Sequence, residues 1–216
     1  MYKLFGYWRS TAAYRVRIAL NLKQVSYENV SVHLVKDGGE QHQPDYRSLN
    51  PQGLVPLLVD GDFRLNQSTA ILEYLDEKYS NPLLLPESLE EKAKVRAFCQ
   101  EIACDIHPLN NLRVLQYLSG PLAVDDKAKS DWYAHWIHQG FTALESELKQ
   151  SSSDGRYCFG SKISMADLYL VPQVYNAMRF NVDLSSFPTI CAINDHCLTH
   201  QAFSDAAPES QPDAVL

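Results

Sequence analysis

Residues 8–23 read WRSTAAYRVRIALNLK, and the rest of the chain is organised around this stretch. Ser10 and Thr11 are good helix N-caps, and apolar residues follow them at helical spacing, so the stretch predicts a helix that begins at these hydroxyls. The apolar run from Lys3 to Tyr7 predicts a strand that leads into it. The N-terminus of such a helix presents unpaired N–H groups and the positive end of its dipole, which favour an anion.

Four basic residues lie in this stretch without an acidic residue among them: Arg9, Arg15, Arg17 and Lys23. In a chain of formal net charge -7 they indicate a local positive site for a negatively charged small molecule. The alternative is an ordinary capped helix whose basic side chains are solvated.

The composition is typical of a globular protein. With 216 residues, 45% hydrophobic and 21% charged, the chain can form one large domain or two small ones. The excess of acidic over basic residues argues against nucleic acid or an anionic membrane as the main partner. We expect neither a signal peptide nor a membrane span, and therefore a cytoplasmic protein.

The cysteines and histidines do not indicate a metal site. The five cysteines are an odd number, and none are two residues apart, so neither a disulfide framework nor a zinc knuckle is expected. His135 and His138 could share a helix face, but no cysteine or acid joins them at ligand spacing.

The N-terminal part of the chain alternates strand and helix signals. Residues 27–34 alternate between apolar and polar, which predicts a strand parallel to the first one. Asp60-Gly61 between two apolar runs predicts an antiparallel hairpin, and Gln67 with Ser68 begins a helix that ends near Tyr79. With a short helix around residues 46–49, this order predicts a thioredoxin-like α/β domain over residues 1–82.

Pro56 precedes the third predicted strand and has no N–H to donate. The Val55–Pro56 bond is a candidate for the cis form, which would turn the backbone of Val55 outward toward a peptide-like ligand. The alternative is a trans proline at a strand edge.

Beyond a proline-containing linker the strand signals disappear. Helical patterns cover residues 89–118, 128–149, 164–180 and 188–198, with a polar loop at 151–155, so residues 88–216 predict an all-α domain. Ser164 and Asp167 have the spacing of a capping box, with Ile163 and Leu168 placed for a hydrophobic staple.

Several motifs in order along the chain carry a resemblance to a known family. Residues 10–20, STAAYRVRIAL, are similar to the signature of the zeta-class glutathione transferases, which is normally Ser-Ser-Cys, two residues and Arg-Val-Arg-Ile-Ala-Leu. The other similar motifs are Lys36-Asp37-Gly38-Gly39, Asn50-Pro51, Gln67-Ser68, Asn111-Leu112 and the run from Ala166 to Val174. The resemblance covers nearly the whole chain and implies the same two-domain fold, with a homodimer as the assembled form.

The resemblance also implies a glutathione site. Ser10 matches the serine whose hydroxyl faces the glutathione sulfur, and Thr11 takes the second hydroxyl position. The residues that match glutathione-binding positions are Ser10, Thr11, Ala12, Arg15, Gln41, Val55, Gln67, Ser68, His107, Asn111 and Arg113. Ala12 stands where the family has a cysteine, so the chemistry must use the hydroxyls and the sulfur of the cofactor.

The activity that the resemblance implies is the glutathione-dependent isomerisation of maleylacetoacetate to fumarylacetoacetate in tyrosine and phenylalanine breakdown. The substrate is an anionic keto acid, and Arg179 matches a family arginine that faces it, with Arg9 as the nearby alternative. Without the resemblance, Arg179 is equally well explained as a cation that complements a helix C-terminus. Transfer of glutathione to α-haloacids, isomerisation of maleylpyruvate, and a non-catalytic binding role remain open.

Overall fold

The computed structural model describes residues 1–151 and 155–215. These residues form two compact units, one of Met1–Leu83 with Thr199–Leu216 and one of Leu84–Leu198. The domain prediction from the sequence includes residues 199–216 in the helical domain, whereas the structure groups them with the N-terminal residues.

The first unit is built on a mixed four-stranded sheet. Its strands β1 (Tyr2–Gly6), β2 (Tyr27–Ser31), β3 (Leu57–Asp60) and β4 (Phe63–Asn66) lie in the order β2-β1-β3-β4. β1 pairs with β2 in parallel, and β3 is antiparallel to both of its neighbours. The predicted thioredoxin-like arrangement is therefore confirmed. β2 is shorter than predicted because its partner β1 ends at Gly6, opposite Ser31.

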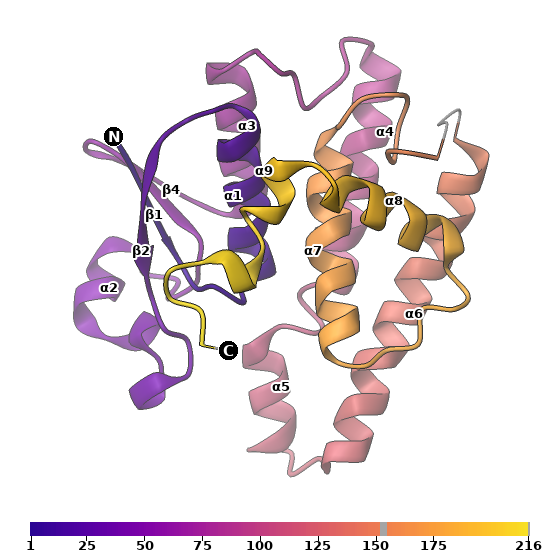
Figure 1. Cartoon of the computed structure of the whole chain (residues 1–216). Helices are drawn as coiled ribbons and strands as arrows, with labels where there is room; N and C mark the ends of the chain where they lie inside the picture. Colours follow the sequence, from indigo (N-terminus) through magenta and orange to yellow (C-terminus); the bar gives the residue numbers. More distant parts are fainter. Residues whose placement is uncertain (152–154, 216) are drawn as a thin grey trace. The chain divides into compact units, whose positions relative to one another are not determined.

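Three helices accompany this sheet: α1 (Thr11–Leu22), α2 (Pro44–Leu49) and α3 (Ser68–Lys78). α1 and α3 pack against each other (Figure 1). Single turns of 3-10 helix at Lys36–Gly38 and Glu40–His42 precede α2. The predicted hairpin at Asp60-Gly61 is confirmed, and Gly61 has the left-handed φ of 61° that the turn requires.

The Lys23 side chain ties the end of α1 to the end of α3. Its Nζ donates to the carboxylate of Asp76 at 2.8 Å and to the backbone oxygens of Tyr79 at 2.6 Å and Pro82 at 2.8 Å. An ammonium group has three N–H donors, so these three acceptors use all of them. The side chain of Lys23 is fully buried.

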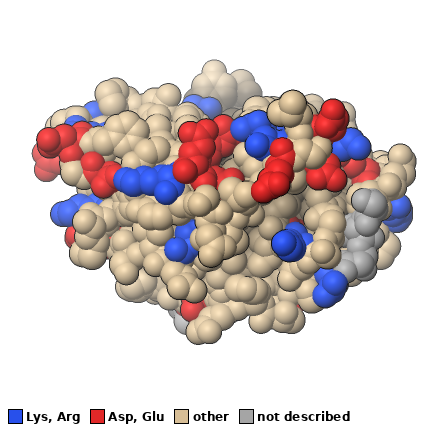
Figure 2. All heavy atoms as spheres, turned by 90° about the horizontal axis from the view of Figure 1, so that it is seen from above, with Lys and Arg blue, Asp and Glu red and all other residues tan. Residues whose placement is uncertain are grey.

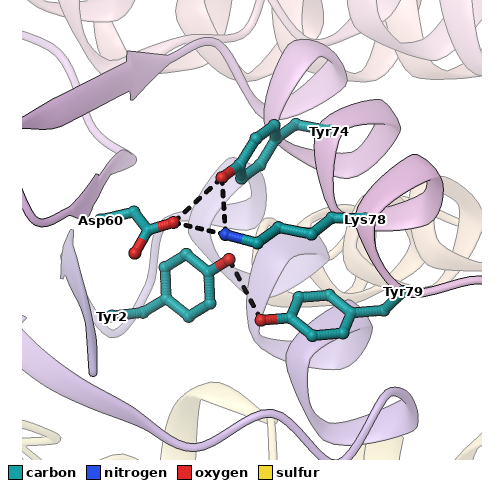
Figure 3. Close-up of polar contacts among 5 residues, drawn as sticks. All are labelled: Tyr2, Asp60, Tyr74, Lys78 and Tyr79. Atoms are coloured by element: carbon teal, nitrogen blue, oxygen red, sulfur yellow. Dashed lines mark hydrogen bonds and ion pairs between the residues drawn. The ribbon is translucent and has the colours of Figure 1, made fainter.

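A second ion pair joins α3 to the hairpin. The Nζ of Lys78 lies 2.6 Å from Asp60 Oδ2, and the Tyr74 hydroxyl donates to the same oxygen at 3.0 Å (Figure 3). The hydroxyl of Tyr79 donates to that of Tyr2 beside this group. The pKa of Asp60 is lowered, chiefly by the hydrogen bond from Lys78.

The C-terminal segment forms α9 (Gln201–Ser204) and a 3-10 turn at Pro208–Ser210. α1 holds this segment through its side chains, because the Tyr14 hydroxyl donates to Phe203 O at 3.1 Å and Asn21 Nδ2 donates to Ala202 O at 3.2 Å.

The second unit is helical over its described residues, 84–151 and 155–198. Its helices are α4 (Leu89–Gln100), a π-helical turn (Glu101–Ile106), α5 (Leu112–Ser119), α6 (Asp126–Gln150), α7 (Met165–Arg179) and α8 (Pro188–Leu198). The prediction of an all-α second domain agrees with these helices. Of the predicted loop at 151–155, residues 152–154 lie outside the described residues.

The single helix predicted over residues 89–118 is wrong. Its backbone widens into the π-helical turn, where the His107 N–H donates to Ile102 O, and Pro108 follows with no N–H to continue the ladder. Asn111 then caps a new helix by accepting from the Arg113 N–H at 3.2 Å.

The capping box at the start of α7 is confirmed. Asp167 Oδ2 accepts from the Ser164 N–H at 2.7 Å and from the Ser164 hydroxyl at 3.0 Å. Burial raises the pKa of Asp167 despite these hydrogen bonds.

Acidic and basic side chains are interspersed on the face of the molecule drawn in Figure 2. Within residues 1–151 and 155–215, no helix has the length and apolar character needed to cross a membrane.

Candidate active site

The start of α1 presents a partly exposed hydroxyl. The Ser10 N–H donates to Tyr7 O at 2.8 Å, which closes a turn between β1 and α1, and Ser10 Oγ accepts from the Ala13 N–H at 3.2 Å. Ser10 is therefore the N-cap of α1, as predicted. Because a hydroxyl has a donor as well as acceptor lone pairs, its proton can be donated to an anion in front of the helix. Thr11, the next hydroxyl, is buried.

The alternative of solvated basic side chains is wrong for three of the four residues, while a positive site for an anionic small molecule at this helix start stays a prediction. Arg15, Arg17 and Lys23 are buried, with overall exposures of 1%, 1% and 7%. Arg17 donates from Nη2 to Trp8 O at 3.1 Å and from Nε to Ala206 O at 2.9 Å, so both of these hydrogen bonds go to backbone carbonyls. Arg9 differs, because it is half-buried and its guanidinium lies 4.0 Å from the centroid of the Trp8 ring.

Two predicted residues lie at the start of α3, and one of them contacts α1. Arg15 Nη1 donates to Ser68 Oγ at 3.3 Å, so the structure brings Arg15 and Ser68 together. Gln67 precedes α3 with φ 68°, an unusual conformation for a residue with a side chain, and its Nε2 donates to Gln52 Oε1 at 3.0 Å. Uncommon backbone conformations of this kind cluster at binding sites, where the surrounding structure holds them.

Gln41 lies in the loop between β2 and α2. Its Nε2 donates to Leu34 O at 3.1 Å, and its Oε1 is buried without a hydrogen-bond partner among the described residues. A Cβ added to Gly39 would meet this amide, and φ at Gly39 is 99°, so glycine is required beside Gln41. A buried carbonyl oxygen of this kind fits an N–H donor of a peptide-like ligand.

The segment before β3 places Val55. The Val55–Pro56 bond is cis, as proposed from the sequence. Tyr46 OH donates to Leu54 O at 2.6 Å and Asn50 Nδ2 donates to the same oxygen at 2.8 Å, which fixes the residue before Val55. Burial raises the pKa of Tyr46 to about 12, so its hydroxyl stays protonated and can donate.

The remaining predicted residues belong to the helical unit. His107 ends the π-helical turn, Asn111 is occupied as the cap of α5, and the side chain of Arg113 is exposed. Arg179 is exposed in the last turn of α7. This position is compatible with both expectations, a cation that complements a helix C-terminus and an arginine that binds the substrate.

Arg179 belongs to an aromatic group that the sequence did not indicate. Its guanidinium lies 4.7 Å from the centroid of the Phe180 ring, and that ring stacks on Tyr133 with centroids 3.9 Å apart. Burial raises the pKa of Tyr133, and the charge of Arg179 opposes this shift. Tyr133 and Phe180 are 47 positions apart in the sequence, so no local pattern could pair them.

A thioredoxin-like unit with a hydroxyl at the start of its first helix, followed by a helical unit, is the arrangement of a glutathione transferase. A family described as "Glutathione S-transferase, N-terminal domain" matches residues 1–77. A probable maleylacetoacetate isomerase of Vibrio cholerae is 54% identical over 98% of this chain and 97% of that protein.

Solved structures agree with this assignment. A bacterial zeta-class maleylpyruvate isomerase, solved in its holo form, matches with a TM-score of 0.96 and 46% identity, over 99% of this chain and 100% of that one. A maleylacetoacetate isomerase from Methylobacterium extorquens AM1, solved with bound malonate and GSH, matches with a TM-score of 0.94 and 40% identity, over 99% of this chain and 100% of that one. The chain belongs to the glutathione S-transferase family, in its zeta class.

Proposed function

We propose that this chain catalyses the glutathione-dependent cis–trans isomerisation of maleylacetoacetate to fumarylacetoacetate. The observation that carries the proposal is the half-buried Ser10 hydroxyl at the N-terminus of α1, in a chain 54% identical to a probable maleylacetoacetate isomerase over nearly its whole length. The buried Gln41 Oε1, which has no hydrogen-bond partner in the part of the chain that the structure describes, and the partly exposed Ser10 hydroxyl fit a tripeptide with N–H donors and a thiol.

The chain's own residues hold and orient the cofactor in this proposal. Ser68 and Gln67 at the start of α3 bind its γ-glutamyl end, the backbone of Val55 pairs with its cysteinyl part, and Gln41 serves its glycyl end. His107, Asn111 and Arg113 are the helical-unit residues that reach the tripeptide. Ala12 and Arg15 belong to the same proposed binding set.

The chemistry that bound glutathione supplies is a thiolate for reversible addition to the cis double bond, which permits rotation about the resulting single bond. The Ser10 hydroxyl donates to this sulfur, and the dipole of α1 favours its negative charge. A free thiol of pKa about 8.5 is already several per cent ionised near neutral pH, so lowering that pKa gains at most about tenfold. Most of the rate must come from orienting the reactants and stabilising the enolate.

The enolate and the substrate carboxylates need cations. Arg179 is our candidate, with Arg9 as the second, since Arg179 is exposed and Arg9 is half-buried, whereas Arg15 and Arg17 are buried. The guanidinium fork suits a carboxylate because it can donate two parallel hydrogen bonds.

Incubation with glutathione and maleylacetone tests the reaction class. We expect the substrate to isomerise while the concentration of glutathione stays constant. A parallel incubation uses dichloroacetate as the substrate. Stoichiometric loss of glutathione there would instead assign the chain to conjugation of α-haloacids. Failure to bind glutathione at all would point to a non-catalytic role.

Maleylpyruvate is the second candidate substrate. It is favoured by the TM-score of 0.96 with a solved maleylpyruvate isomerase. A kcat/KM for maleylpyruvate well above that for maleylacetone would select it.

We also infer a homodimer in the cytoplasm. All five cysteines are free thiols, which fits a reducing compartment. Sedimentation at micromolar concentration should give twice the mass of 24.5 kDa, and a strictly monomeric mass would contradict the dimer.

A further inference from the structure

The C-terminal segment makes a direct hydrogen bond to the turn that carries Ser10. The Trp8 N–H donates to Asp213 Oδ2 at 3.2 Å, although the two residues are 205 positions apart. The Ser31 hydroxyl, at the end of β2, donates to the same oxygen at 2.9 Å. One carboxylate oxygen therefore joins the turn after β1 to the end of β2.

A buried cation, Arg17, links the backbone carbonyl of Trp8 to the same C-terminal segment. Arg17 donates to Trp8 O from Nη2 and to Ala206 O from Nε, so its guanidinium bridges the turn and the C-terminal segment. Both polar groups of the Trp8 backbone are thus fixed by contacts that lead to residues 206–213.

The segment is itself fixed where it makes these contacts. Gln211 Nε2 donates to Asp205 O at 3.0 Å and to Ala207 O at 2.9 Å, and the Trp8 side chain is buried. The segment that precedes Asp213 is therefore held by hydrogen bonds of its own.

The geometry points to Asp213 as a positioning residue that holds the turn of residues 7–10 so that the Ser10 hydroxyl faces the glutathione sulfur. This inference rests on the proposed function, because it concerns the orientation of the hydroxyl toward the cofactor. Ser10 is two residues beyond Trp8, and its own N–H closes the turn on Tyr7 O, so a shift at Trp8 moves Ser10. A displacement of about 1 Å at a reacting group can lower a rate by as much as a hundredfold.

Only one of the two carboxylate oxygens of Asp213 has a hydrogen-bond partner among the described residues. Its Oδ1 is buried without a hydrogen-bond partner in residues 1–151 and 155–215. A buried, unpartnered carboxylate oxygen costs stability, and an asparagine would accept the same Trp8 N–H without burying a charge.

The test is a pH titration of the thiolate absorbance of glutathione bound to the purified full-length chain. In Asp213→Ala the Trp8 N–H loses its acceptor, and we expect the thiolate pKa to rise toward that of free glutathione, by up to about two units. kcat/KM for maleylacetone should fall about tenfold or more, and the Trp8 amide should exchange faster with solvent.

Asp213→Asn retains an acceptor oxygen and should keep the wild-type titration. Asp205→Ala is the matched control, because it removes an exposed acidic side chain from the same segment, and it should also leave the titration unchanged. If Asp213→Ala does not fold, Asp213→Ser replaces it, since the shorter side chain keeps a polar group but loses its reach.

An unchanged thiolate titration in folded Asp213→Ala or Asp213→Ser, whatever its thermal midpoint, would overturn the positioning role. Loss of the wild-type titration in Asp213→Asn would overturn it as well. If the unaltered chain binds no glutathione, the proposed function fails, and the Trp8 amide exchange still measures whether Asp213 holds the turn.

Discussion

Two lysine–aspartate pairs in the thioredoxin-like unit both involve α3, yet their surroundings are opposite. Lys23 and Asp76 have side-chain exposures of 0% and 6%, whereas those of Lys78 and Asp60 are 40% and 32%. The buried pair also holds two backbone carbonyls, while the exposed pair lies among tyrosine hydroxyls (Figure 3). The buried pair is therefore part of the interior of the unit, whereas the exposed pair remains in contact with solvent.

The same division applies to the basic residues of the stretch that opens the chain. Arg15, Arg17 and Lys23 are buried, and the last two make hydrogen bonds that support the fold, whereas Arg9 and the Ser10 hydroxyl are partly exposed at the start of α1. A cluster of charges in the sequence is therefore a weaker guide to a ligand site than the exposure of each side chain.

The largest expected effect is on the buried pair. Lys23→Met leaves the buried carboxylate of Asp76 without its lysine and should lower the free energy of unfolding by about 3 to 5 kcal/mol. Chemical denaturation measures this loss. Lys78→Met is the matched control, and the double variant Lys23→Met/Asp76→Leu should recover part of the stability. Equal losses in Lys23→Met and Lys78→Met would remove the distinction between the two pairs.

Arg179 extends the comparison to the helical unit, because it is an exposed cation with a proposed chemical role. Arg179→Ala should lower kcat/KM for maleylacetone about ten- to a hundredfold, or roughly 1.5 to 3 kcal/mol, with little change in glutathione affinity. Arg179→Lys keeps the charge but loses the planar fork, so it should also weaken catalysis.

Lys149→Ala is the control for Arg179, since Lys149 is an exposed cation in the last turn of α6, where it pairs with Glu145 at 3.1 Å. A cation that only complements a helix end contributes a few tenths to about 1 kcal/mol of stability and nothing to turnover. kcat/KM for Arg179→Ala within twofold of wild type would move the substrate anion to Arg9 or to the start of α1.

The smallest effect is expected at the exposed pair. The pKa of Asp60 is lowered in the folded state by Lys78, so its contribution is present above the unfolded pKa of about 3.9 and is lost as pH falls through the folded value. Asp60→Asn should therefore lower the thermal midpoint slightly at neutral pH, and the difference from wild type should disappear in acid. A difference that grows as pH falls would contradict this account.

Local signals in the sequence predicted much of the fold. Ser10 as a helix cap, the hairpin at Asp60-Gly61 and the capping box of Ser164 with Asp167 all depend on residues a few positions apart, and all three are present. Gln67 and Ser68 were placed correctly at a helix start for the same reason.

The features that the sequence did not predict depend on distant partners or small backbone changes. Arg17 donates to Ala206 O, and Asp213 accepts from the Trp8 N–H. The two residues of each pair are about two hundred positions apart along the chain, so no local sequence pattern connects them. The π-helical turn at Glu101–Ile106 keeps an almost helical pattern of apolar residues, which hides the change in hydrogen bonding.

The most direct test of the account is the turnover of maleylacetone by Ser10→Ala and by Ser10→Ala/Thr11→Ala, compared with wild type under saturating glutathione. Loss of the hydroxyl nearest the proposed sulfur position should reduce turnover by up to about tenfold through the thiolate pKa, and by more if Ser10 also orients the sulfur. The double variant should lose at least as much as the single one. Unchanged turnover in both variants would contradict the assignment of the α1 hydroxyls to the reaction.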